Sequence, residues 1–151
     1  MTGLLLFLHV LGVIAWLGGG LGTMLTGITA KPFETVERLA VYRTMSAVSR
    51  NLIGPGAVLV VVTGFGLSAP YMKSGAMPGW LMAMQGFGLL GALVAIFIVT
   101  PTAARLGRLM ADPRGELPEA FHTLRKRQSV FATVAGVLAL LALASATIFR
   151  G

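Results

Sequence analysis

Residues 3–30 read GLLLFLHVLGVIAWLGGGLGTMLTGITA, a run without a single Asp, Glu, Lys or Arg. A helix rises about 1.5 Å per residue and the hydrocarbon core of a bilayer is about 30 Å thick, so a helix over this run would cross the membrane with length to spare. No basic residue precedes the run, and it is longer than the apolar part of a signal peptide. We therefore expect a retained first transmembrane helix.

The rest of the chain repeats this pattern of apolar runs joined by polar segments. The hydrophobic fraction is 56% and only 11% of residues are charged, whereas soluble domains carry about 25% charged residues. We predict an all-α integral membrane protein, an antiparallel four-helix bundle that forms one domain over residues 1–151. The further spans are expected at about residues 52–69, 80–100 and 130–149, and cytoplasmic polar helical segments at about 33–50 and 101–129.

The distribution of positive charge predicts the orientation of the bundle. Of the 12 Lys and Arg residues, ten lie in segments 31–50 and 105–127, and the other two are Lys73 and Arg150. Because Lys and Arg gather in cytoplasmic loops, both termini are expected outside a multi-pass protein of the cytoplasmic (inner) membrane. The net charge of +7 then indicates contact between the basic loops and anionic lipid headgroups rather than nucleic acid.

Several functional classes are disfavoured by what the sequence lacks. The four apolar runs contain no charged residue, which argues against proton pumps and ion-coupled transporters. No nucleotide-binding, zinc or nucleophile-elbow motif is present. Without cysteine, the chain has no disulfide, thiol nucleophile or iron–sulfur ligand. We therefore do not expect the chain to be an enzyme on its own.

One face of the first span carries the candidate site. His9, Gly12, Trp16 and Gly19 follow one another at helical spacings of three and four. An imidazole in hydrocarbon is costly unless it binds a partner or a metal. The face predicts either the wall of a haem b site with His9 as axial ligand, or a hydrogen-bonded histidine above a packed Trp16. Gln85 of the third span could hydrogen-bond His9, although a plain link between two helices is the preferred interpretation.

Two other residue classes leave alternatives open. The many glycines suit close helix packing, or they make room for a flat cofactor. The methionines near the outer turn could hold Cu(I), or they could fill gaps in the packing. The functional alternatives are thus a structural subunit of a homo-oligomer or larger membrane complex, and a copper-handling membrane protein. These methionines are Met72, Met77, Met82 and Met84.

The spacing of His9, Trp16 and the small pair that follows resembles the first span of three related bacterial membrane groups. They are the haem-containing four-helix protoporphyrinogen oxidases, the copper-resistance D proteins and an uncharacterised four-span family known as a domain of unknown function. Residues 63–67 (TGFGL) and 79–81 (GWL) resemble the second and third spans of the same groups.

The resemblance implies that His9 ligates haem, as the matching histidine does in the oxidases. It leads us to expect a small haem-binding redox protein or accessory redox subunit. Those oxidases also carry a lysine shortly after the tryptophan of the third span, where residues 82–85 here read MAMQ. This departure argues against protoporphyrinogen oxidation.

Overall fold

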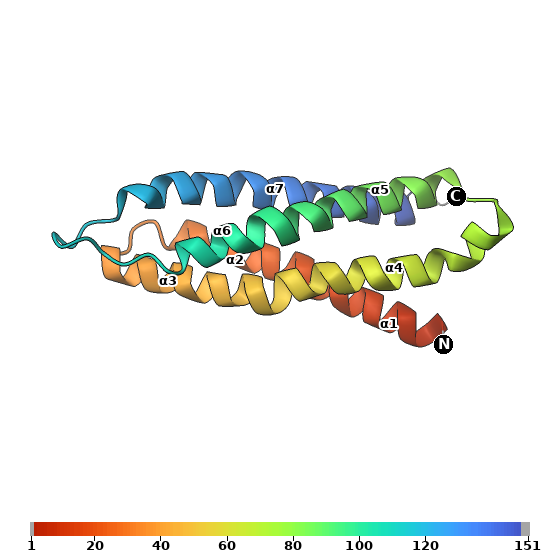
Figure 1. Cartoon of the computed structure of the whole chain (residues 1–151), viewed down its shortest axis with the longest axis horizontal. Coiled ribbons are helices and arrows are strands. Elements are labelled where there is room, and N and C mark those ends of the chain that lie inside the picture. Colours follow the sequence, from red (N-terminus) through yellow and green to blue (C-terminus); the bar gives the residue numbers. More distant parts are fainter. Residues whose placement is uncertain (1, 149–151) are drawn as a thin grey trace.

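A computed structural model describes residues 2–148 of the chain, and over this range it contains helices and no strand. Four long helices lie side by side, and the described chain begins and ends at the same end of the bundle (Figure 1). Each helix is long and apolar enough to cross a membrane. The prediction of an all-α, four-helix membrane bundle is therefore confirmed. The residues predicted as the end of the fourth span and the last outer charge, Phe149 and Arg150, lie outside the described range.

Three of the four long helices contain a short π-helical segment near their middle. The first consists of α1 (Thr2–Val13), η1 (Ile14–Gly18) and α2 (Gly19–Thr29). The second consists of α3 (Thr35–Val48), η2 (Ser49–Ile53) and α4 (Gly54–Ser74), and the third of α5 (Gly79–Val94), η3 (Ala95–Val99) and α6 (Thr100–Leu106). The fourth, α7 (Glu119–Thr147), is α-helical throughout.

The prolines inside the second and third helices do not end them. A proline usually marks a helix end or a bend, yet Pro55 and Pro101 each stand in the first turn after a π segment, and the helix continues beyond them. A proline lacks the N–H of a normal helical bond and its ring crowds the preceding turn. The wider π turn upstream can accommodate both defects. Segment 33–50 and span 52–69 are accordingly parts of one continuous helix rather than two elements.

The outer turn is shorter than the sequence indicated. The spans predicted from the sequence leave residues 70–79 between them, but α4 continues to Ser74 and ends at Gly75, whose φ of 68° gives a left-handed cap. Tyr71 and Trp80 meet edge to face across this turn, with ring centroids 6.5 Å apart. The helical position of Tyr71 allows this contact to close the turn.

The bundle has two separate apolar cores. The first surrounds Trp16 and consists mainly of small residues from all four helices, including Ala57, Ala92 and Ala139. The second lies at the opposite end from the termini, which we call the basic end because segments 31–50 and 105–127 gather there. It is built from Leu39, Tyr42, Leu106 and Phe121, with the Tyr42 and Phe121 rings in edge-to-face contact at 5.1 Å. The helices thus pack together well beyond the apolar spans.

The outer surface of the bundle is apolar. Phe97 in η3 has 69% of its surface exposed, and large exposed side chains of this kind run along all four helices. A soluble monomer rarely exposes continuous apolar surface of this extent. The protein is therefore a multi-pass integral membrane protein whose apolar outer surface faces lipid.

The orientation remains a prediction with a direct test. The chain has no cysteine, so single cysteines report accessibility without background. We expect Ser74→Cys, at the outer turn, to react with a membrane-impermeant maleimide in intact cells. Pro113→Cys, in the connection before α7, should react only after permeabilisation. Labelling in the opposite order would show that the basic end faces outward.

Candidate functional site

The candidate site is built around His9, which α1 directs toward α4. The His9 Nδ1 atom lies 3.0 Å from the Thr63 hydroxyl oxygen, so the two helices are joined by a polar contact. The next residue of α4 is Gly64, and a Cβ there would stand 3.3 Å from Cε1 of the imidazole. The absence of a side chain at Gly64 therefore leaves room for the ring, which is half-buried.

The hydrogen bonds of Thr63 select one tautomer of the imidazole. Its single hydroxyl hydrogen is donated to the Leu59 carbonyl, 2.5 Å away, so the oxygen accepts from Nδ1–H of His9. In the neutral ring the lone pair is then on Nε2. The ring also forms a hydrogen bond with the backbone of Val60. The lone pair of Nε2 is therefore the position at which the imidazole could bind a metal, in the half of the bundle that holds the chain termini.

The rest of the predicted haem-facing surface is covered by the second helix. A Cβ at Gly12 would lie 3.0 Å from the Gly56 carbonyl oxygen, and one at Gly56 would lie 2.9 Å from the Gly12 carbonyl oxygen. A Cβ at Gly19 would meet Ile53 at 3.0 Å. Gly12 is therefore a point at which two helix backbones touch, whereas Gly19 contacts Ile53 and also lines an open groove.

Trp16 is also used for packing. It is 5% exposed and belongs to the membrane core, and its Cη2 atom would lie 3.1 Å from a Cβ at Gly91 of α5. The indole thus bridges the first and third helices two turns below His9. This arrangement matches the alternative in which Trp16 packs in the core beneath a hydrogen-bonded histidine.

Within residues 2–148, Gln85 forms neither a hydrogen bond with His9 nor a hydrogen-bonded link to another helix. Its Nε2 atom is enclosed and has no hydrogen-bond partner in the described part of the chain. His9 is bonded to Thr63 instead, so the structure does not join Gln85 to His9. An enclosed amide without a partner costs about 1–3 kcal/mol, and such groups in native proteins commonly bind water or a ligand.

No conventional metal centre accompanies His9. Across the described residues, no group of three or more His, Cys, Asp or Glu side chains could hold a metal ion. The methionines considered for copper do not form a common enclosed surface, because Met72 and Met82 are exposed while Met77 and Met84 are half-buried. Copper binding stays a prediction.

Comparison with known proteins places the chain in a family. A family model described as a predicted integral membrane protein (DUF2269) matches residues 3–149. The chain belongs to the DUF2269 family. Searches of curated proteins and of solved structures found no match. The expected relationships of this DUF2269 chain to the copper-resistance D proteins and the protoporphyrinogen oxidases stay predictions.

Two features of the DUF2269 chain were not found by sequence reasoning. The first is the partnership of His9 with Thr63 and Gly64, for which the available signal was a hydroxyl residue beside a glycine within an apolar run. The second is an open, almost wholly apolar groove of about 600 Å³ between the first helix and the α3–η2 segment. It is lined by Gly18 and Gly22 on one side and by Met45 and Leu52 on the other.

Proposed function

We propose that the protein binds a b-type haem through Nε2 of His9 and acts as a small redox protein or accessory redox subunit. The observation that supports this most is the bond between Nδ1–H of His9 and Thr63. A histidine that ligates a metal characteristically donates its other ring N–H to a fixed acceptor, which sets the tautomer and the ring orientation. Thr63 supplies that acceptor, and this tautomer places the lone pair on Nε2.

Fewer residues could contribute to a haem site than the sequence pattern indicated. His9 would hold the iron, Thr63 would orient the imidazole, and Gly64 would leave space beside the ring. Gly12 is buried against the second helix, whereas Gly19 is half-buried and borders the open groove. A bound haem would supply one-electron transfer, with a potential set by its axial ligands and surroundings.

The test is an absorption spectrum of detergent-purified protein produced with ample haem supply, in the oxidised and dithionite-reduced states. We expect a Soret band and reduced α and β bands in the wild type and none in His9→Ala. Thr63→Val should weaken haem binding roughly 10- to 100-fold, because it removes the acceptor that orients the ligand.

His122→Ala provides the matched control, since His122 is the other histidine of the chain and lies at the basic end. This variant should keep the full spectrum. A flat visible spectrum from the wild type, or equal bands in His9→Ala, would overturn the haem proposal.

A second candidate function, a structural subunit of a membrane complex, is favoured by the open groove. Gly18 and Gly22 have no atom within 4 Å of the position of a Cβ, so another helix could approach their backbone closely. A colourless protein that co-purifies with stable partners, and loses them in Gly22→Leu, would support this function in place of haem binding.

A further inference from the structure

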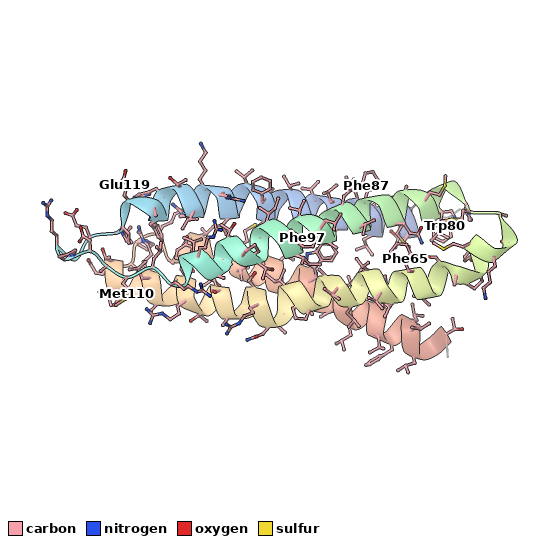
Figure 2. All side chains as sticks on the ribbon, viewed as in Figure 1. Phe65, Trp80, Phe87, Phe97, Met110 and Glu119 are labelled. Carbon is pink, nitrogen blue, oxygen red and sulfur yellow. The ribbon has the colours of Figure 1, made fainter. Side chains whose placement is uncertain are left out.

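The last helix passes from a basic surface to an apolar one within about one turn. Its first turns carry His122, Arg125 and Lys126, and from Val130 onward its large exposed side chains are apolar, beginning with Val130 at 51% exposure. Figure 2 shows side chains projecting from α7, whose first residue, Glu119, is labelled. Because α7 is uninterrupted, the residues around Ser129 mark the level at which it enters the hydrocarbon.

A small open hollow lies at this level. Its volume is about 280 Å³, and it is lined by His122, Arg125, Lys126, Ser129 and Val130. These residues follow the spacing of one helical face, so their polar groups converge on the same space. The His122 ring packs edge-on against the fully buried Phe121, with centroids 5.6 Å apart. The hollow therefore offers several hydrogen-bond donors at the membrane boundary.

Within residues 2–148, the cations of this hollow form no ion pair. Among the described residues, neither Arg125 nor Lys126 forms an ion pair or hydrogen bond. The acidic residue nearest to them along α7 is Glu119, which lies well over a turn away and is not bonded to them. Two neighbouring positive charges without a carboxylate partner favour an anion from outside the chain.

We propose that this hollow binds the phosphate of an anionic phospholipid headgroup. Arg125 and Lys126 contact the phosphate, and Ser129 donates a hydrogen bond to the headgroup. The acyl chains then lie along the exposed apolar stripe that starts at Val130 and continues through Val134 and Val137. This stripe favours a lipid over free phosphate, because it adjoins the cationic hollow directly. The proposal is independent of haem binding at His9.

The experiment titrates the detergent-purified full chain with short-chain phosphatidylglycerol and, separately, phosphatidylcholine, and counts bound lipids by native mass spectrometry. We expect preferential binding of phosphatidylglycerol. Each basic residue near a membrane surface contributes about 1 kcal/mol toward anionic lipid, so Arg125→Gln/Lys126→Gln should weaken binding about 30-fold. Arg43→Gln/Arg114→Gln removes the same charge from exposed positions outside the hollow and should bind like the wild type.

Several outcomes decide the proposal. If both double variants lost phosphatidylglycerol binding to the same extent, net charge alone would explain the effect and a defined site would be overturned. Equal binding of phosphatidylglycerol and phosphatidylcholine would overturn it too. Inorganic phosphate that binds as tightly as the lipid would also overturn it, because the apolar stripe would then contribute nothing. If the Arg125→Gln/Lys126→Gln variant does not remain monodisperse, Lys126→Gln alone, at an exposed position, should still weaken phosphatidylglycerol binding about fivefold.

Discussion

Gly56→Ala is expected to separate the first two helices and to lower the stability of the purified protein markedly. A Cβ at Gly56 would stand 2.9 Å from both the Gly12 carbonyl oxygen and the Trp16 amide nitrogen. Both neighbours are backbone atoms, so no side-chain rotation can relieve the clash. The first helix would have to move, and Trp16 would move with it out of the membrane core. Overpacking of this kind costs about 1–3 kcal/mol, and Gly56→Leu should prevent folding.

The measurement is thermal unfolding in detergent, followed by tryptophan fluorescence and by size-exclusion chromatography. Gly22→Ala is the matched control, because it lies in the first helix with no atom within 4 Å of its added Cβ. Alanine favours a helix over glycine by about 0.5–1 kcal/mol, so this control should be neutral or slightly more stable. If Gly56→Ala and Gly22→Ala unfolded at the same temperature, the close approach of the two helix backbones would be refuted.

Phe121→Ala should open the basic end of the bundle while leaving the membrane core intact. The Phe121 side chain is fully buried, and it contacts Tyr42 edge to face. Removing a buried aromatic ring from a core costs about 3–5 kcal/mol, and Phe121 lies in the cluster that holds the basic end together. The starts of α3 and α7 should then become accessible to protease and hydrogen exchange.

Limited proteolysis with mass spectrometry locates the cuts, and Trp16 fluorescence reports on the membrane core. Phe97→Ala serves as the control, since this phenylalanine is 69% exposed on the outer surface. It should leave the cleavage pattern unchanged. A protected basic end in Phe121→Ala would mean that the second core contributes little to holding the helices together.

The fold was largely predictable because the decisive signals are local. Charge-free runs reveal the spans, and the lengths of the polar segments reveal their connections. The course of the chain at Pro55 and Pro101 was harder to predict, because a proline favours a helix end or a bend and here the helix continues through both. A π segment precedes each of these prolines, but η1 forms without one, so prolines alone do not specify where these segments lie.

The candidate site was predictable only in part. His9 stands out because it is the one ionisable residue in an apolar run. Its partner Thr63 does not, because their meeting depends on the rotation and register of α1 against α4. The contact between Gly12 and Gly56 fixes that register, and glycine patterns alone do not identify which pairs will meet. The haem expectation relied on a face on which this same contact covers Gly12.

The π segments also determine how the chain tolerates changes in length. A π turn holds about one residue more than an α turn, and each residue rotates a helix by about 100°. Deleting one residue from η2 could restore regular helix, but it would turn all of α4 relative to α3 and move Thr63 away from His9. In each of the first three helices, the residues before and after the π segment therefore differ in their rotation about the helix axis from those of a regular α-helix. Chimaeras between family members should therefore be joined away from these segments, with the extra residue retained.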